Sequence, residues 1–140
     1  MTDPVDGNDR HTRGLEVLHM LAGGDPAKLE SMSALDDVTP DLRRLVVDFA
    51  YGEIYSRPGL DPQRRHLVTL SALVALGDTE AELRTHVGLA LNIGVLPKEI
   101  VETVLHLAVY AGFPRAWAAM RVLQQVFRER GIIDEVDATG

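Results

Sequence analysis

Two acidic residues and one histidine have the types and spacing that acid–base chemistry requires. Glu82 lies four residues before His86, so their side chains share one face of a helix. Glu53 continues an apolar stripe formed by Leu42, Leu45, Val46 and Phe49. A carboxylate on such a face is desolvated unless it is paired, and desolvation favours its protonated form. These three residues could therefore exchange protons with a bound molecule.

Each of these residues also has a structural explanation. Thr79 and Glu82 have the spacing of a capping box, which would use the Glu82 carboxylate to begin a helix. His86 has apolar neighbours, where a buried histidine without a catalytic role is common. Glu53 precedes Arg57 by four residues, so these two residues could form an ion pair. The pattern alone leaves both explanations open.

Thiol and metal chemistry have no support in the sequence. The chain contains no cysteine, which excludes a thiolate nucleophile. Glu102 and His106 are one helical turn apart, but one helix supplies too few ligands for a metal ion, and no H-E-x-x-H pattern occurs. A solvated face or a subunit contact explains this pair better. We expect no metal site.

Charge and hydropathy limit the partners that we expect. The net charge of the 140 residues is −7, which argues against nucleic acid, because binding phosphates needs a basic surface. The start of the chain has neither the basic nor the apolar region of a signal peptide. The longest apolar run, 67–76, is far shorter than the roughly 20 residues that span a membrane. We expect a cytoplasmic protein with no membrane contact.

Proline, glycine and apolar periodicity predict an all-α protein. Proline is favoured in the first turn of a helix and glycine just after the last turn, and no strand-like alternation is sustained. We expect a single-domain bundle of about six to seven antiparallel helices. The helices are predicted near residues 14–22, 26–35, 40–55, 62–76, 80–93, 97–111 and 114–130.

The same pattern predicts domain limits and helix faces. We expect a flexible N-terminal tail over 1–12, a helical domain over 13–131 and a C-terminal tail over 132–140. Helix 62–76 is apolar almost all round from Leu67 onward, so it should be central and fully buried. Helix 80–93 has two apolar stripes, and another subunit could cover the second.

Three blocks of residues resemble the carboxymuconolactone decarboxylase family. The first is Tyr51-Gly-Glu-Ile-Tyr-Ser-Arg-Pro-Gly-Leu-Asp61, followed by Arg65 eight residues after Arg57. The second runs from Glu82-Leu-Arg-Thr-His86 to Gly94, and the third from Glu99 to Val109-Tyr-Ala-Gly-Phe-Pro114. Their order and spacing match the family over roughly two-thirds of the chain.

The resemblance implies a fold, an activity and an assembly. Members are small AhpD-like helical subunits assembled as trimers or hexamers, and they decarboxylate 4-carboxymuconolactone without a cofactor. The fold also serves thiol peroxidases; Thr79 and Glu82 stand at the positions of their cysteines, and His86 matches their histidine. The chain departs from the decarboxylase pattern at four residues, which could change the shape of the pocket: Tyr51, Tyr55, Ile93 and His106.

The implied reaction assigns roles to particular residues. The substrate carbonyl accepts the electrons that carbon dioxide leaves behind, so no metal or organic cofactor is expected. Arg57 and Arg65 are candidates for binding the retained carboxylate, and Tyr51 for lining the substrate site. His86 is the candidate proton donor, oriented by Glu82, and Glu53 is the second acid–base candidate. Structurally, Arg57 could instead cap a helix, and Arg65 could pair with Glu53.

We therefore expect a cofactor-independent decarboxylase that acts on 4-carboxymuconolactone, or on a related unsaturated acid, and yields the enol lactone of 3-oxoadipate. The partners expected are a small anionic substrate and further copies of the chain, as a homotrimer or homohexamer. One alternative is a natural-product tailoring decarboxylase or isomerase with a bulkier substrate. The other is an oligomeric binding protein that kept the fold and lost the chemistry.

Overall fold

The computed structural model describes residues 7–25 and 30–138, and within these ranges every regular element is a helix. The all-α prediction is therefore confirmed for the described part of the chain. The chain forms two compact units, Met1–Asp61 and Pro62–Gly140. Among the described helices, none combines the length and the apolar character that crossing a bilayer would require.

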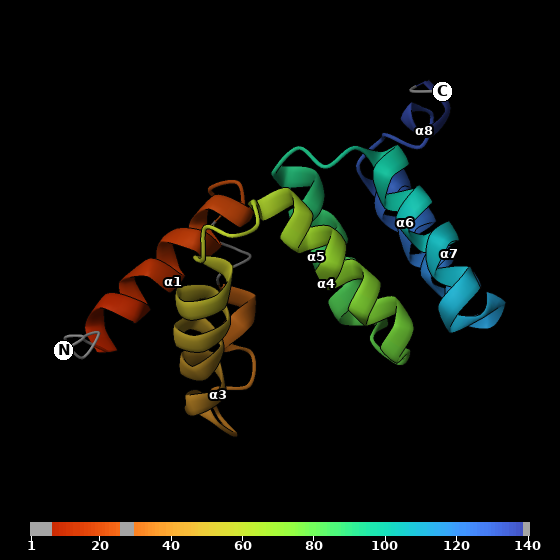
Figure 1. Ribbon diagram of the computed structural model, residues 1–140. Coiled ribbons are helices and arrows are strands. Elements are labelled where there is room, and N and C mark those ends of the chain that lie inside the picture. Colours follow the sequence, from red (N-terminus) through yellow and green to blue (C-terminus); the bar gives the residue numbers. More distant parts are fainter. Residues whose placement is uncertain (1–6, 26–29, 139–140) are drawn as a thin grey trace. The chain divides into compact units, whose positions relative to one another are not determined.

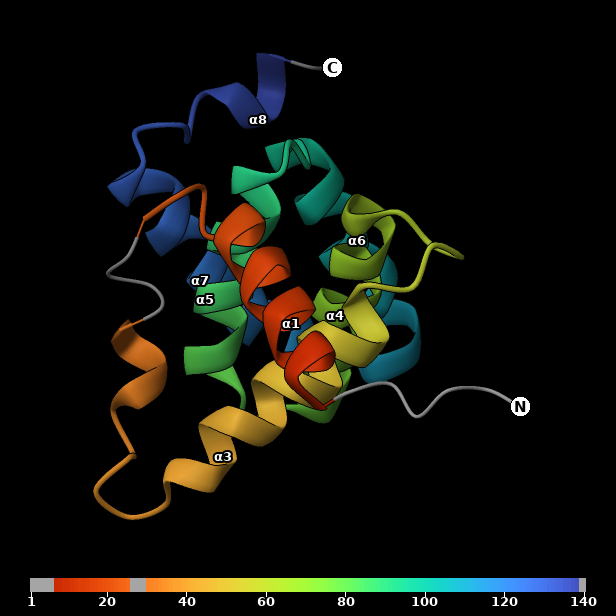
Figure 2. The same cartoon turned by 90° about the vertical axis from the view of Figure 1, so that its left-hand side faces the viewer.

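Figure 1 shows the helical elements described for the first unit. They are α1 (Gly7–Leu21), the 3₁₀ turn η1 (Ser31–Ser33), α3 (Pro40–Leu45) and the π-helix η2 (Val46–Tyr55). Helix α3 continues directly into η2, and α1 lies along η2 (Figure 2). This pairing of α1 with η2 is the main packing contact of the unit.

Two predictions for this unit are wrong in part. Helix α1 begins at Gly7, so residues 7–12 are helical and do not form a tail, whereas residues 1–6 lie outside the described residues. Among the described residues of the helix expected over 26–35, Glu30 is helical, Ser31–Ser33 form η1, and residues 34–35 lie in a turn. Ser33 Oγ donates a 2.6 Å hydrogen bond to the Glu30 carbonyl. Residues 26–29 lie outside the described residues.

The π-helical geometry changes which face of the predicted helix 40–55 is buried. A π-helix bonds residue i to i+5, so its side chains recur at a wider spacing than those of an α-helix. The buried residues of η2 are Val47, Tyr51 and Gly52, which are four and five positions apart. Leu45 and Phe49, on the stripe expected to be buried, are 53% and 61% exposed. The predicted burial of this stripe is therefore wrong for the single chain.

Two glycines allow α1 and η2 to approach each other at backbone distance. A Cβ atom added at Gly14 of α1 would lie 2.1 Å from the Val47 carbonyl oxygen. A Cβ atom added at Gly52 of η2 would lie 2.2 Å from the Arg10 carbonyl oxygen. Arg13 Nε also donates a 3.2 Å hydrogen bond to the Gly52 carbonyl. Only residues without a Cβ fit at these two points, so the crossing depends on both glycines.

The second unit is built from α4 (Pro62–Leu76), α5 (Glu80–Asn92), α6 (Pro97–Ala111), α7 (Phe113–Glu129) and the short α8 (Glu135–Ala138). Helix α4 packs on α5 and α6, and α7 packs on α5 and α6 (Figure 1). The buried core lies among these four long helices. It includes Leu70, Val74, Leu83, Val87, Ala90, Ile100, Val104, Leu123, Val126 and Phe127.

The predicted helix boundaries are largely confirmed in this unit. Pro62 and Pro97 each begin a helix, where the missing proline N–H leaves no bond unmade. Gly77 ends α4 with φ +70°, a backbone conformation that favours glycine. The capping box predicted at Thr79 and Glu82 does not form: Thr79 Oγ1 donates a 2.6 Å hydrogen bond to the Leu73 carbonyl at the end of α4.

Two further expectations differ from the structure. Helix α4 is not fully buried in the single chain, because Val68 and Leu76 are 59% and 68% exposed. The residues expected as a C-terminal tail include α8, and Ile132 and Val136 pack against the core. The apolar side chains at these two positions therefore keep the segment after Gly131 against the unit.

The glycine crossing predicts the effect of adding one methyl group. We expect Gly14→Ala and Gly52→Ala each to destabilise the protein by about 1–2 kcal/mol. Overpacking against backbone costs about 1–3 kcal/mol, and the helix preference of alanine offsets only about 0.5–1 kcal/mol of this. The measurement is the midpoint of urea unfolding.

Gly59→Ala is the matched control, because nothing lies within 4 Å of an added Cβ atom there. We expect its urea midpoint to match that of the wild type or to exceed it slightly. Equal midpoints for all three variants and the wild type would show that α1 and η2 can move apart without loss of stability.

Candidate functional site

The six candidate site residues are shared equally between the two units. Tyr51, Glu53 and Arg57 belong to the first unit, and Arg65, Glu82 and His86 belong to the second. Two of the first three lie on η2, and Arg57 follows it after one residue. Arg65 lies on α4, while Glu82 and His86 lie on α5.

In the second unit, His86 lies beside a second histidine, His66 of α4. The ring centroids are 5.7 Å apart and the ring planes are tilted by 38°. His66 is fully buried and His86 is partly buried. His86 Nδ1 is itself inaccessible to solvent and has no hydrogen-bond partner among the residues that the structure describes. The packing of α4 on α5 therefore creates a pair of imidazoles.

The surroundings of His66 determine which of its nitrogens carries the proton. Its Nδ1 lies 3.3 Å from the Pro62 carbonyl oxygen. A carbonyl can only accept a hydrogen bond, so this contact needs a proton on Nδ1. In the neutral ring, Nε2 is then the basic nitrogen.

Burial and the neighbouring ring keep His86 neutral. Burial, the largest cause, and the nearby His66 together lower the pKa of His86 from 6.5 to about 4, whereas Glu82 opposes both effects. Burial also lowers the pKa of His66. At pH 7 the free protein therefore holds His86 as neutral imidazole. A proton donor at this position must gain its proton when a ligand binds.

The other two candidates of this unit flank the pair. Glu82 is exposed and lies one turn before His86 on α5. With no capping box, its carboxylate is not used to begin the helix, and its negative charge favours the protonated form of His86. Arg65 is partly buried and adjoins His66 on α4.

In the first unit, Glu53 is less buried than its position on the apolar stripe suggested. Its side chain is 40% exposed, and one carboxylate oxygen lies 3.7 Å from Arg10 Nε. The expected desolvation of Glu53 is therefore weak. A structural ion pair was the alternative for this residue, and the structure shows one with Arg10 of α1, a partner that spacing within one helix could not identify. Arg57 is exposed just after η2.

Tyr51 is the buried candidate of the first unit. Its ring lies 5.0 Å from that of Tyr55, and only 7% of the residue is exposed. Burial, with a smaller effect from Tyr55, raises the pKa of Tyr51 to about 12. Its hydroxyl group therefore stays protonated and can donate a hydrogen bond at any physiological pH.

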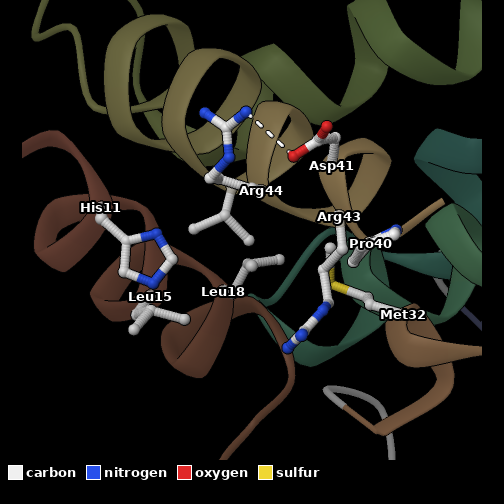
Figure 3. A pocket seen from close by; sticks show the side chains of 9 residues that line it. His11, Leu15, Leu18, Met32, Pro40, Asp41, Arg43 and Arg44 are labelled. Atoms are coloured by element: carbon white, nitrogen blue, oxygen red, sulfur yellow. Dashed lines mark hydrogen bonds and ion pairs between the residues drawn. The ribbon is translucent and has the colours of Figure 1, made fainter. Parts of the chain in front are cut away.

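A pocket of about 450 Å³ also lies within the first unit (Figure 3). Leu15 and Leu18 of α1, Met32 and Val47 form much of its apolar lining, and Arg43, Arg44 and His11 add polar groups. The polar groups have acidic partners: Arg43 with Asp36 at 3.0 Å, Arg44 with Asp41 at 3.2 Å, and His11 with Asp48 at 2.7 Å. The lining does not include Tyr51, Glu53 or Arg57.

His66 was not among the site residues predicted from the sequence. A signal was present, because His66, Leu70 and Val74 recur at four-residue spacing on the buried face of α4. His106, in contrast, is exposed on α6 and stacks on Tyr110 at 5.5 Å. No cluster of three or more potential metal ligands occurs among the described residues.

The lowered pKa of His86 predicts how stability depends on pH. The unfolded ring takes up a proton near pH 6.5, whereas the native ring stays neutral until about pH 4. The unfolded state therefore binds more protons in this window, and stability falls as the pH falls from 6.5 to 4. The difference corresponds to about 3 kcal/mol. We expect His86→Gln to remove most of this contribution, measured by urea unfolding across that range.

His106→Gln is the matched control for that experiment, since it replaces an exposed histidine of the same unit. It should retain the wild-type dependence of stability on pH. If His86→Gln retained it as well, burial of the His86 ring could not be the cause.

Comparison with known proteins gives two decarboxylases. The chain is 39% identical to 4-carboxymuconolactone decarboxylase of Acinetobacter baylyi over 131 residues, which are 94% of this chain and 96% of that protein. It is also 39% identical to nitrosuccinic acid decarboxylase npaB of Metarhizium robertsii over 136 residues, which are 92% of each chain.

A third relative is an uncharacterized 15.0 kDa protein of Paracoccus denitrificans, 30% identical over 99 residues, which are 70% of this chain and 74% of that protein. The sequence model of the Carboxymuconolactone decarboxylase family matches residues 40–125, which include all six candidate residues. The order and spacing of the three blocks and the two near-complete relatives lead to one conclusion: this chain belongs to the carboxymuconolactone decarboxylase family.

Proposed function

We propose that the protein is a cofactor-independent decarboxylase that converts 4-carboxymuconolactone, or a closely related unsaturated lactone acid, into the enol lactone of 3-oxoadipate. The observation that carries this proposal is the 39% identity to 4-carboxymuconolactone decarboxylase over 94% of the chain. The neutral, partly buried His86 within the family match supports it, because the reaction ends with a proton transfer.

The substrate can accept the electrons that its own decarboxylation releases. The bond between the ring carbon and the departing carboxylate breaks, carbon dioxide leaves, and the electron pair passes into the unsaturated carbonyl as a dienolate. A proton then adds to carbon and gives the enol lactone. The protein must bind the retained carboxylate, stabilise the enolate oxygen and supply that proton.

In this proposal, the negative charge of the substrate raises the pKa of His86, so that the ring takes up a proton when the substrate binds. The neutral ring of the free protein would face a molecule with two carboxylates, and nearby negative charge favours the imidazolium form. Solvent would supply the proton that the ring takes up when the substrate binds. The charged ring would then give this proton to the dienolate carbon and so return to the neutral state. Glu82 acts in the same direction from one turn away. Glu53 remains the second candidate donor.

Arg57 and Arg65 are the proposed carboxylate-binding residues, because a guanidinium group can bind a carboxylate with two parallel hydrogen bonds. Arg65 is partly buried, where such a bond is screened less by water than at the surface. Tyr51 would contribute a neutral hydroxyl donor near the substrate, since its pKa is raised to about 12.

An alternative substrate is supported by nitrosuccinic acid decarboxylase npaB, to which the chain is 39% identical, the same value as for 4-carboxymuconolactone decarboxylase. A nitro group can accept the electron pair left by decarboxylation, as an unsaturated carbonyl does, so both reactions need a bound diacid and a proton source. The alternative proposal is therefore a tailoring decarboxylase on an acyclic or bulkier diacid. Tyr51 and Tyr55, two of the four residues at which the chain departs from the decarboxylase pattern, favour an altered pocket.

Turnover of 4-carboxymuconolactone tests the proposal directly. We expect release of carbon dioxide with purified protein, without added metal or cofactor and in the presence of a chelator. His86→Gln should lower kcat roughly 100- to 10,000-fold, the range for losing a general acid. His106→Gln should leave kcat near the wild-type value.

The outcomes separate the candidates. Turnover of nitrosuccinic acid but not of the lactone would reject the lactone proposal and favour the alternative. A His86→Gln variant with wild-type kcat, together with an inactive Glu53→Gln variant, would move the donor role to Glu53. A folded protein that turns over neither acid would contradict both proposals.

Assembly into a homotrimer or homohexamer is proposed together with this function. Five apolar side chains on α6 and α7 are between 52% and 78% exposed in the single chain: Leu105, Val109, Tyr110, Phe113 and Trp117. Phe113 and Trp117 border a hollow of about 630 Å³ with a mostly apolar lining. Exposed apolar patches of this kind are typical of protein interfaces.

We expect the double variant Phe113→Ser and Trp117→Ser to weaken this assembly, since each large apolar side chain that is buried contributes about 1.5–3 kcal/mol. Light scattering should then report a mass nearer the 15.4 kDa of one chain. Gln125→Ser, at an exposed polar residue of the same helix α7, is the control and should retain the wild-type mass. A wild-type protein that is already a monomer would contradict the assembly.

A further inference from the structure

His66 is the one charged or polar residue that is fully buried among those the structure describes. Placing an imidazole in an apolar core carries a desolvation cost that leucine or phenylalanine at the same position would avoid. The position belongs to the buried stripe of α4 with Leu70 and Val74. Packing alone does not explain a histidine here, which points to a neighbouring group on which the ring acts.

The geometry identifies that group as His86. The two rings face each other across the contact between α4 and α5, with centroids 5.7 Å apart. The hydrogen bond from His66 Nδ1 to the Pro62 carbonyl holds the first ring in place. A ring fixed in this way limits the orientations that His86 can adopt beside it.

We propose that His66 is a positioning residue that acts through His86: it orients the His86 ring and delays its protonation until an anionic substrate is bound. The inference deepens the function proposed above and rests on it. Two imidazoles this close cannot both hold a proton without strong repulsion at low solvent exposure. A proton on either ring therefore disfavours a proton on the other.

Among the charged groups near α5, His66 is the one that disfavours a proton on His86. On α5 itself, Glu82 favours the protonated form of His86, and Arg84 is paired with Glu129 of α7. From the end of α7, Arg130 donates hydrogen bonds of 2.9 and 3.1 Å to Asn92 Oδ1 and the Gly88 carbonyl. From α4, Arg65 precedes His66 by one residue, but the charges that affect the pKa of His86 are those of His66 and Glu82.

A consequence for selectivity follows from this arrangement. Because the resting His86 ring is neutral, it does not attract simple anions by charge. A ligand must supply enough negative charge beside the ring to offset both burial and His66 before the proton is taken up. A molecule with two carboxylates meets this condition better than a molecule with one, which agrees with the diacid substrates considered above.

The test measures the protonation of His86 by NMR, so it does not depend on turnover. Long-range proton–nitrogen correlation spectra follow each imidazole during a pH titration. In His66→Gln we expect the pKa of His86 to rise from about 4 toward 6.5. The rise should be incomplete, because burial, the largest cause, remains. His106→Gln removes an exposed histidine and should leave the pKa of His86 near 4.

The wild-type protein supplies a second measurement if His66→Gln fails to fold. Coupled rings titrate together, so each should follow a two-step curve and not a simple single-step one. Independent single-step curves for both rings would overturn the proposal. An unchanged pKa of His86 in folded His66→Gln would overturn it as well, since a purely structural His66 affects stability without affecting that titration.

The pH dependence of kcat/KM in His66→Gln tests whether the coupling of the two rings affects the reaction. If His86 must be protonated to act, kcat/KM falls as the pH rises through the pKa of the free protein. A higher pKa in His66→Gln then moves this falling limb to higher pH, and His106→Gln leaves it in place. If the protein turned over neither acid, the function would fail, whereas the NMR titration would still decide the coupling of the two rings.

Discussion

The packing of α4 on α5 places two imidazoles in each other's immediate surroundings, and the properties of the second unit's candidate site follow from this constraint. Burial alone would make each ring a weak base, and the second ring adds repulsion between the two protonated forms. The apolar core that holds the rings together is built from all four long helices of the unit. The proton affinity of His86 is therefore a property of the core as a whole and not of its own helix.

Much of the fold could be predicted because helix boundaries depend on local chemistry. Helix ends at Pro62, Pro97 and Gly77 follow from the local backbone preferences of proline and glycine and do not depend on tertiary contacts. The errors occur where longer-range contacts decide. Thr79 has the type and spacing of a capping residue, yet its hydroxyl bonds to the carbonyl of Leu73 in the preceding helix. The buried face of η2 was mispredicted because an α-helical period was applied to a segment with wider turns.

The candidate site shows the same division. His86 and Glu82 could be chosen from their spacing and from the matched blocks, because both lie on one helix. The partner of Glu53 could not, since Arg10 is more than forty positions away in the sequence and meets Glu53 only when α1 lies along η2. His66 was overlooked for a related reason: its stripe on α4 indicated burial, but only the packing of α4 on α5 shows which ring it faces.

The wide turns of η2 have a consequence for how relatives of this chain can differ in length. Each π-type bond spans one residue more than an α-type bond, so deletion of one residue from Val46–Tyr55 could restore ordinary α geometry without breaking the helix. Every later side chain of the segment would then turn by about 100° around the helix axis. Tyr51 would leave the buried side and a neighbour would take its place. Insertions and deletions at this point therefore offer a way to exchange the residues that meet α1 without altering the core between α4 and α7.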